Sequence, residues 1–495
     1  MQTNASKTTR VCVPVCEKNL STFFSACERA AKWADVVELR LDCLDQEQLT
    51  NVVSELSRLS YPVILTFRPS EEGGYRNLSR HERDTFWKTH APRGDAILWD
   101  VEPDLAHDVS PDWARTIVSH HNFSSVPSDL EKIYERLGQT PARILKIAVH
   151  ANDIVDCIPV FRLIERARSE GREIIAIAMG DAGIATRILG PSRGAFLTYG
   201  SLDEDSATAP GQINARKLRS LYNIDAINRE TMVCGLVGCP VMHSVSPHIH
   251  NAAFAYEGVN GVYLPFEVKD INSFIKRMVH PRTRELNWNL RGLSITAPHK
   301  QTVMEYLDWI ESEAQEIGAV NTIVIEKDRL LGYNTDTAGF IEPLLKRIGS
   351  LESKQVAIIG AGGAARAAIW ALNRAGANVT LFARDVSKAT SSFDAPYQPL
   401  SSSSFSKYDL VINATPAAPA TQEQLRGARF VYDLVYNPIE TQLLREAREA
   451  GCETLGGLEM LVAQAKIQFE LWTGKTSSSS IMYDSAAAAL APVRI

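Results

Sequence analysis

The chain has 495 residues, of which 45% are hydrophobic and 22% charged, a balance typical of soluble globular proteins. At roughly 100–250 residues per domain, this length predicts two to four domains. A formal net charge of −6 gives no reason to expect nucleic acid or an anionic membrane as a partner. The first ten residues are polar and no apolar run approaches membrane-spanning length, so we expect a cytoplasmic protein.

Short strand-like segments alternate with stretches of helical period from residue 11 to about residue 200. The eight segments span 11–15, 36–41, 62–67, 96–101, 115–120, 143–149, 173–179 and 195–200. Eight βα units in roughly 220 residues predict a (β/α)8 TIM barrel, whose active site would lie at the C-terminal ends of the strands.

The C-terminal half begins with a new buried strand at 233–238, which places a domain boundary near 225–231. A second boundary is expected near 337–354. The predicted α/β domains are a barrel over 1–226, a lobe over 227–338 that helices at about 460–495 complete, and a dinucleotide-binding lobe over 339–459. The serine-rich run 476–482 is expected to be a loop.

Eight cysteines lie scattered through apolar segments, with no CxxC motif and no nearby histidine cluster. They occupy positions 12, 16, 27, 43, 157, 234, 239 and 452. This distribution favours buried thiols in a reducing compartment over disulfides, and it predicts no metal site.

Two residues of the barrel segment could carry chemistry. Lys146 lies in a strand whose neighbours are all aliphatic, and His121 ends another apolar strand. A strand lysine can also extend its amine outward to water. An apolar site, however, favours the neutral amine, which is a nucleophile able to form an imine. His121 could transfer protons near neutral pH, whereas its neighbour His120 would point the opposite way.

Charged side chains recur at other strand ends of the barrel segment. Glu38 and Arg40 lie on the same side of one strand, Glu72 follows Arg68, and Arg187 comes after the seventh strand. Surface salt bridges are the alternative explanation, but charged pairs inside apolar strands favour a functional site.

Five motifs appear in order: ELRLD (38–42), TFRPSEEGG (66–74), SHHNF (119–123), LKIAV (145–149) and SATAPGQ (206–212). Through them, residues 11–225 resemble type I 3-dehydroquinate dehydratase. The resemblance implies dehydration of 3-dehydroquinate to 3-dehydroshikimate, with an imine at Lys146, His121 as proton shuttle and Glu72 orienting it. It implies substrate contacts from Glu38, Arg40, Arg68, Arg187, Thr208 and Gln212. Asn122 and Thr208 replace the family's usual aspartate and serine.

A dinucleotide-binding turn is indicated by the strand at 356–360, the sequence GAGGAAR (360–366) and the alanine-rich helix after it. The next strand, 378–383, is followed by Arg384 and Lys388, where an enzyme that uses NAD would carry a carboxylate. These two cations fit the 2′-phosphate of NADP, so we expect NADP in preference to NAD, although Asp385 stands beside Arg384.

Further motifs are GCPVMHSVSPHIHN (238–251), LSITAPHK (293–300), GAVNT (318–322), YNTDTAGF (333–340) and GGLEMLVAQA (456–465). With them, residues 232–475 resemble shikimate dehydrogenase. This implies a two-lobed module, with an α/β substrate-binding lobe and a Rossmann lobe, that reduces 3-dehydroshikimate to shikimate with NADPH. Lys300 and Asp336 match its catalytic pair. Implied substrate contacts are Ser244, Ser246, Thr296, Asn321, Tyr436 and Gln464. Implied cofactor contacts are Gly360, Ala361, Gly362, Gly363, Ala364, Arg384, Lys388, Asn413, Thr415 and Gly457.

Two other functions stay open at this stage. The dehydrogenase half could prefer quinate, although Ser244, Ser246 and Thr296 favour shikimate. A regulatory protein made of inert copies would have no chemical reason to keep an imine-forming lysine. We expect small-molecule partners only, namely 3-dehydroquinate, 3-dehydroshikimate, shikimate and NADP(H), with no metal, nucleic acid or membrane. The sequence does not indicate an oligomeric state.

Overall fold

The computed structural model describes residues 9–56, 59–90, 96–109, 112–383, 396–400, 404–417 and 419–491. Contacts within the chain divide it into two compact units. The first comprises Met1–Val233, Val237–Met242 and Asn260–Leu290, and the second comprises Cys234–Leu236, His243–Val259 and Arg291–Ile495.

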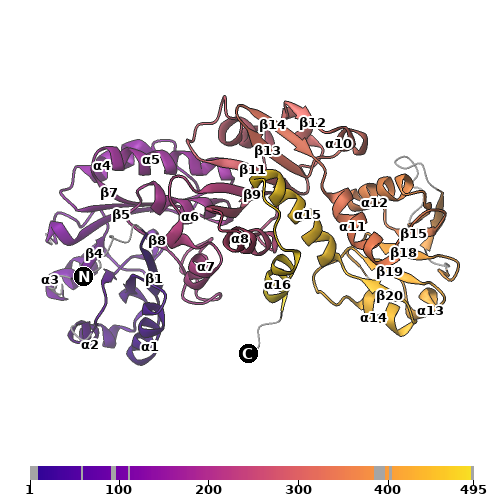
Figure 1. Ribbon diagram of the computed structural model, residues 1–495. Helices are drawn as coiled ribbons and strands as arrows, with labels where there is room; N and C mark the ends of the chain where they lie inside the picture. The colour runs from indigo at the N-terminus through magenta and orange to yellow at the C-terminus, as the bar shows by residue number, and fades with distance from the viewer. Residues whose placement is uncertain are drawn as a thin grey trace, which may run out of the picture. The chain divides into compact units, whose positions relative to one another are not determined.

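The first unit contains eight parallel strands in the order β7-β6-β5-β4-β3-β2-β1-β8 (Figure 1). They are β1 Val11–Val15, β2 Val36–Arg40, β3 Val63–Thr66, β4 Ile97–Val101, β5 Thr116–Asn122, β6 Ile144–His150, β7 Glu173–Met179 and β8 Thr198–Tyr199. A parallel bridge between Ile174 and Ala195 connects β7 to the segment that leads into β8 and closes the ring. The predicted barrel is confirmed, and each predicted strand segment overlaps one of its strands.

Helices alternate with the barrel strands along the chain. They are α1 Leu20–Ala31, α2 Leu49–Glu55, α3 Arg80–His90, α4 Leu130–Gly138, α5 Cys157–Ser169, α6 Ile184–Arg193 and α7 Ala215–Ser220. α1 is representative, because Asn19 caps its first turn and Phe23, at helical spacing from other apolar residues, is buried. Inside the ring, Ile64, Ile144 and Ile177 belong to one core, so the strands are buried on both faces.

A second sheet has six strands in the order β10-β9-β11-β13-β14-β12. They are β9 Met232–Gly238, β10 Gly261–Glu267, β11 Leu290–Ile295, β12 Trp309–Ile310, β13 Thr322–Glu326 and β14 Arg329–Tyr333. β13 runs antiparallel to both β11 and β14. The helices between these strands are α8 Ser246–Tyr256, α9 Ile271–Phe274 and α10 Ser312–Ile317.

Two C-terminal helices, α15 Gly457–Thr473 and α16 Ser479–Leu490, return to this part of the molecule. Gln468 of α15 accepts a hydrogen bond of 2.8 Å from Ser294 of β11, and Ser485 of α16 donates one of 3.0 Å to the His248 carbonyl of α8. The prediction of a loop over 476–482 is wrong from Ser479 onward. The buried Met482 and Ala486 lie one turn apart on α16, and their packing outweighs the modest helix propensity of serine.

The third sheet is parallel throughout, in the order β17-β16-β15-β18-β19-β20. Its strands are β15 Gln355–Ile359, β16 Asn378–Ala383, β17 Tyr397–Pro399, β18 Leu410–Asn413, β19 Phe430–Asp433 and β20 Glu453–Leu455. This order is that of a doubly wound dinucleotide-binding sheet, with its switch point beside β15.

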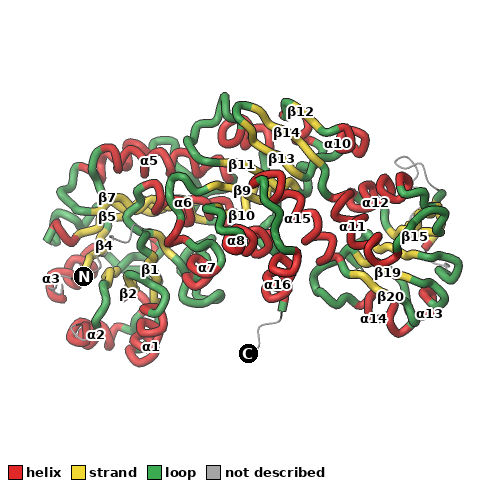
Figure 2. Tube along the Cα trace, viewed as in Figure 1, coloured by secondary structure: helices red, strands yellow, loops and turns green. Residues whose placement is uncertain are grey.

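Helices cover both faces of the third sheet (Figure 2). Val356 and Ile358 of β15 pack in one core with side chains of α11 Asp336–Ile348 and α12 Gly363–Arg374. Ala357 and Ile359 pack in another core with α13 Gln422–Leu425 and α14 Gln442–Glu449. The predicted Rossmann lobe is therefore confirmed as a three-layer structure.

One prediction about the cysteines is wrong, because Cys16 and Cys43 form a disulfide. The other six cysteines are free, and all but Cys239 are buried. Cys16 directly follows β1, and Cys43 ends the 3-10 turn Leu41–Cys43 that directly follows β2. Since β1 and β2 are neighbouring parallel strands, their C-terminal ends lie side by side. Spacing rules based on CxxC motifs do not detect such a pair.

No helix among the described residues has the length and apolar character needed to cross a membrane. In the same part of the chain, no group of three or more His, Cys, Asp or Glu side chains is arranged to hold a metal ion.

Two candidate active sites

Lys146 lies in a buried charged cluster inside the barrel. Its Nζ is 2.7 Å from Asp100 Oδ2 and 3.4 Å from Glu38 Oε1, and it lies 3.0 Å from the Tyr199 hydroxyl. The side chain is buried, but the expectation of purely apolar surroundings is wrong. The inward positions of β2 and β4 bring two carboxylates to the amine, and these groups can accept its hydrogen bonds.

Asp100 is shared by two cations, because its Oδ2 also accepts a hydrogen bond of 2.6 Å from Arg68. Burial alone would raise the pKa of Asp100, but the charges of Arg68 and Lys146 outweigh that effect and hold the pKa below its ordinary value. Arg68 also lies 3.6 Å from Glu102. Burial raises the pKa of Glu102 to about 7, against the opposing effect of Arg68. Asp100 is therefore the firmly ionised carboxylate of the cluster.

His121 is held by Glu72. The His121 backbone N–H donates to Glu72 Oε2 at 2.9 Å, and the ring Nδ1 lies 3.1 Å from the same oxygen. Burial, followed by the positive charges of Arg68 and Lys146, holds the pKa of His121 well below 6.5. The ring is consequently neutral at neutral pH, which is the state a general base requires. His120 is not among the residues that line the pocket into which His121 points.

One pocket, here called the barrel pocket, receives both Lys146 and His121. Every residue predicted to bind substrate in the barrel also lines it, namely Glu38, Arg40, Arg68, Arg187, Thr208 and Gln212. Glu72 does not line the pocket and lies behind His121. The structure thus brings together residues that are far apart in the sequence, since Glu38 and Gln212 are separated by 174 positions.

Arg187 is the cation of the barrel pocket for which the described residues provide no anionic partner. It lies in α6 with 1% of its surface exposed, and it donates one hydrogen bond of 3.0 Å to the Pro210 carbonyl. Within the described residues it forms no salt bridge, and burial lowers its pKa to about 10. A buried guanidinium without a counter-ion is unfavourable by itself and is well suited to a ligand carboxylate.

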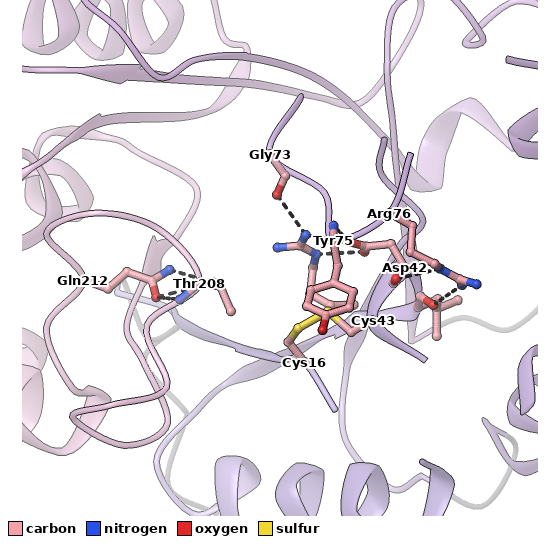
Figure 3. Close-up of a disulfide and its surroundings, with 10 residues drawn as sticks. Cys16, Asp42, Cys43, Gly73, Tyr75, Arg76, Thr208 and Gln212 are labelled. Carbon is pink, nitrogen blue, oxygen red and sulfur yellow. Dashed lines mark hydrogen bonds and ion pairs between the residues drawn. A yellow bond between two sulfur atoms is a disulfide. The ribbon is translucent and has the colours of Figure 1, made fainter. Parts of the chain in front are cut away.

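Arg40 is oriented by Asp42, which is fully buried. Asp42 accepts hydrogen bonds of 2.9 and 2.7 Å from the Arg40 guanidinium, and one of 2.8 Å from the Tyr75 backbone. Arg40 also donates to the Gly73 carbonyl at 3.1 Å. Figure 3 shows Asp42 and Tyr75 beside the disulfide, and Gly73 further from it. Arg40 is therefore held at the edge of the barrel pocket.

A second polar cluster lies in the second unit. Lys300 Nζ is 2.6 Å from Asp336 Oδ2, where α11 begins. Asn321 donates to the other oxygen of Asp336 at 2.9 Å and to Gln464 Oε1 at 3.1 Å. Four side chains predicted from separate motifs therefore form one hydrogen-bonded group.

Gln464 reaches this group because α11 and α15 approach closely. A Cβ atom placed on Gly339 of α11 would lie 2.7 Å from the Gln464 Cβ and 2.9 Å from its backbone nitrogen. Only glycine has room at that position, so the motif glycine is explained by helix packing.

The other predicted substrate contacts of this half are not joined to that group. Ser244 and Ser246 lie at the start of α8, with their hydroxyl oxygens 3.0 Å apart. Thr296 follows β11 and Tyr436 follows β19. In the described part of the chain, no hydrogen bond connects these four residues to Lys300 or Asp336.

The predicted dinucleotide turn has the backbone conformation that requires glycine. Gly360 has a φ of +112°, and a Cβ atom there would lie 2.8 Å from the Thr415 side chain. Asn413 is fully buried and accepts from the Thr415 backbone at 2.9 Å and its hydroxyl at 2.7 Å, so it shapes this loop. α12 begins directly after Gly362, which leaves its N-terminal amides next to the turn.

The remaining cofactor predictions are located as follows. Ala361 and Gly362 belong to the turn, and Gly363 and Ala364 start α12. A Cβ atom on Gly457 would lie 2.3 Å from the Leu434 carbonyl oxygen, so this glycine permits α15 to pack on the segment after β19. Arg384 and Lys388 lie outside the described residues.

Four polar residues of the barrel site escaped the sequence analysis: Asp42, Asp100, Glu102 and Tyr199. A signal existed for two of them. Asp100 and Glu102 stand at alternate positions that begin with Leu98 in the β4 segment, and such carboxylates on one side of a doubly buried strand must face the barrel interior. Tyr199 and Asp42 carry no comparable pattern.

Protein-family models match four segments of the chain. They are type I 3-dehydroquinase over 11–229, the shikimate dehydrogenase substrate binding domain over 236–323, a putative NAD(P)-binding domain over 349–448 and the shikimate 5′-dehydrogenase C-terminal domain over 457–486.

Similar proteins match one half of the chain or both. The shikimate dehydrogenase (NADP(+)) of Methanocaldococcus jannaschii is 39% identical, covering 52% of this chain and 96% of that protein. The solved dehydroquinate dehydratase and shikimate dehydrogenase from S. pombe is 25% identical over 97% of this chain and 98% of that chain, with a TM-score of 0.44. The chloroplastic bifunctional 3-dehydroquinate dehydratase/shikimate dehydrogenase of Arabidopsis thaliana is 34% identical, covering 94% of this chain and 82% of that protein. The chain therefore belongs to the family of bifunctional 3-dehydroquinate dehydratase/shikimate dehydrogenases.

Proposed function

We propose that the barrel dehydrates 3-dehydroquinate to 3-dehydroshikimate and that the second half reduces this product to shikimate with NADPH. Membership of the bifunctional family supports the pair of reactions. The single observation that carries the assignment of residues is the convergence of Lys146, His121 and Arg187 in one pocket, where Arg187 has no salt-bridge partner among the described residues.

In the barrel, Arg187 binds the substrate carboxylate through a bidentate contact. Arg40, Thr208 and Gln212 are placed around the same pocket to bind ring hydroxyls. These contacts hold the substrate ketone against Lys146. Binding energy from the carboxylate end is thus used to orient the reacting end.

The Lys146 ammonium first passes a proton to neutral His121, and the freed amine attacks the ketone carbon. The proton then returns from His121 to the carbonyl oxygen, which departs as water and leaves a protonated imine. The protonated imine withdraws electrons and acidifies the neighbouring C–H. Neutral His121 removes that proton, and the resulting imidazolium returns it to the departing hydroxyl, which leaves as a second water. Hydrolysis of the imine releases 3-dehydroshikimate and Lys146. Glu72 keeps the His121 ring in place throughout.

In the second half, the residues present fit a dinucleotide cofactor, because the Gly360 turn and the α12 N-terminus leave room for a pyrophosphate. Arg384 and Lys388 would hold the 2′-phosphate. When bound there, NADPH would supply the hydride that reduces the ketone carbon. Lys300 donates a proton to the oxygen that becomes the alcohol, and Asp336 positions Lys300 at 2.6 Å.

The direct test incubates the full chain with 3-dehydroquinate and NADPH and identifies the product by mass spectrometry. We expect shikimate. Quinate would mean that the second half reduces the first substrate directly, and no turnover would favour an inert ligand-binding protein. Lys146→Ala should abolish dehydration and spare reduction of added 3-dehydroshikimate, whereas Lys300→Ala should do the reverse. Loss of both activities in either folded variant would contradict two independent sites.

The same proposal includes three domains, 1–226, 227–338 with 460–495, and 339–459, in a cytoplasmic protein without a metal cofactor. Replacing Arg384 by Gln should raise the KM for NADPH far more than that for NADH. Equal effects on both cofactors would remove the basis for NADP preference.

A further inference from the structure

Cys16, which forms a disulfide with Cys43, lines a cavity of about 310 Å³ that adjoins the barrel pocket. Arg40, Gly73 and Thr208 line both spaces. Cys16 is exposed to solvent, whereas Cys43 is buried. A thiol in solution can therefore reach the sulfur of Cys16.

The disulfide is adjacent in sequence to the residue that orients Arg40. Cys43 is the residue after Asp42, whose carboxylate holds the Arg40 guanidinium at 2.9 and 2.7 Å. Figure 3 shows the two sulfur atoms beside Asp42 and Tyr75. Because the turn is covalently attached to Cys16, Asp42 has a fixed position, and Arg40 keeps its direction.

A second set of contacts runs from the same turn to the loop after β3. Arg76 donates to the Asp42 carbonyl at 2.9 Å, and Arg40 donates to the Gly73 carbonyl at 3.1 Å. This loop carries Glu72, which accepts two contacts from His121. Glu72 contacts His121 directly and not through the turn that contains Cys43. We therefore expect reduction of the disulfide to displace His121 less than Arg40.

We propose that the Cys16–Cys43 disulfide is a positioning element of the dehydratase site, and that its reduction weakens binding of 3-dehydroquinate while the dehydrogenase stays unchanged. The inference rests on the proposed role of Arg40 in substrate binding. Hydrogen bonds from Asp45 to the Lys18 carbonyl at 2.9 Å and from Leu20 to the Gln48 side chain at 2.7 Å remain after reduction. The turn therefore loosens without unfolding of the barrel.

The reductant is a dithiol. Its thiolate attacks the Sγ of Cys16, which is the exposed residue of the pair, the S–S bond breaks, and Cys43 leaves as a thiolate that takes up a proton. The second thiol then displaces Cys16 from the mixed disulfide. The dithiol is oxidised to its own disulfide, and the protein gains two thiols. Disulfides of proteins in reducing compartments are usually transient or redox-sensing, which fits an exposed bond beside an active site.

The test uses the oxidised full chain before and after treatment with dithiothreitol. Thiol titration of the unfolded protein should rise from the six free cysteines to all eight. We expect the KM for 3-dehydroquinate to rise about fivefold with a kcat change of less than roughly twofold, the pattern of lost binding. Reoxidation should restore the KM. Dehydrogenase activity in the same sample serves as the internal control.

Two variants sharpen the result. Cys16→Ser should have the raised KM from the start and should not respond to dithiothreitol. Cys27→Ala removes a buried thiol from the neighbouring helix α1, keeps the disulfide and should respond as the unmodified chain does.

Four outcomes would overturn the inference: no increase in thiols, an unchanged KM once eight thiols are present, parallel loss of both activities, or a Cys16→Ser variant that still responds. An oxidised chain without any dehydratase activity is a different result, because it would refute the proposed function of the barrel and this inference with it.

Discussion

Lys146 Nζ and Asp100 Oδ2 lie 2.7 Å apart, and the same carboxylate oxygen accepts a hydrogen bond of 2.6 Å from Arg68. One buried oxygen is thus shared by two buried cations. Removing its charge would leave Lys146 and Arg68 as like charges with one counter-ion fewer. Asp100 consequently controls both the position of the nucleophile and the charge balance around it.

Asp100→Asn should lower the kcat of dehydration about 100-fold, because a displacement of the Lys146 amine by about 1 Å is enough to disrupt its attack on the ketone carbon. It should also lower the free energy of unfolding of the barrel by roughly 3 kcal/mol, since a buried ion pair loses one partner. The measurements are a steady-state assay of 3-dehydroshikimate formation and denaturant unfolding.

The matched control for this variant is Asp108→Asn. Asp108 pairs with Arg80 at the surface, where an ion pair contributes little, so both quantities should stay within error. A dehydration rate that Asp100→Asn leaves unchanged would show that Glu38 alone is sufficient to hold Lys146.

The pH dependence of dehydration should reflect the low pKa of His121. Because burial and the charges of Arg68 and Lys146 hold this pKa well below 6.5, the ring stays neutral, and able to accept a proton, as the pH falls through 6.5. The acid limb of the kcat/KM profile should therefore have its midpoint below pH 6.5. A midpoint at or above that value would contradict either the burial of the ring or its role as base.

The same depressed pKa has a consequence for stability. Below pH 6.5 the unfolded chain binds a proton on this histidine while the folded chain does not, so His121 favours unfolding increasingly as the pH falls toward the folded pKa. His121→Gln should remove this contribution. Chemical denaturation of the variant and the parent at pH 5 and pH 7.5 should show a smaller loss of stability at pH 5 for the variant.

The barrel was predictable from the sequence because its strands are buried on both faces and read as short apolar runs at regular intervals. Lys146 and His121 stood out within those runs for the same reason. Asp42 did not, because a carboxylate after a strand resembles an ordinary turn residue until its pairing with Arg40 is known. Tyr199 was missed because a tyrosine near a strand end is as common in a core as in a site.

The disulfide shows a different limit of the sequence. Cys16 and Cys43 are 27 residues apart, and only the pairing of β1 with β2 brings their positions together. The serine run illustrates the opposite case, since Ser479 begins a helix through packing of residues further along the chain. Pairing between distant segments and packing against them are properties of the fold and not of a local pattern.

Arg187→Met should separate ligand binding from stability. Loss of a bidentate contact to the substrate carboxylate should raise the KM for 3-dehydroquinate about 100-fold. The ligand-free protein should nevertheless gain about 1–2 kcal/mol of stability, because the variant removes a buried cation that has no salt-bridge partner among the described residues. Thermal unfolding without ligand checks the second effect. A variant that is both inactive and less stable would indicate a structural role for Arg187.

Gly339→Ala should damage the dehydrogenase through helix packing. In an exposed helix this substitution stabilises by about 1 kcal/mol. Here the new Cβ would lie 2.9 Å from the backbone nitrogen of Gln464, and backbone cannot move aside as a flexible side chain can. Overpacking of this kind costs roughly 1–3 kcal/mol, so the net effect should be destabilising.

The displacement of α15 by Gly339→Ala should also pull Gln464 from Asn321, which lies 3.1 Å away and holds Asp336. We therefore expect the kcat/KM for 3-dehydroshikimate to fall about tenfold, as for a mispositioned site, with dehydration unchanged. Gly138→Ala is the matched control, because it ends α4 with no atom within 4 Å of the added Cβ and should leave both activities intact. If Gly339→Ala kept full reductase activity, the contact between α11 and α15 would not be what positions Asp336 beside Lys300.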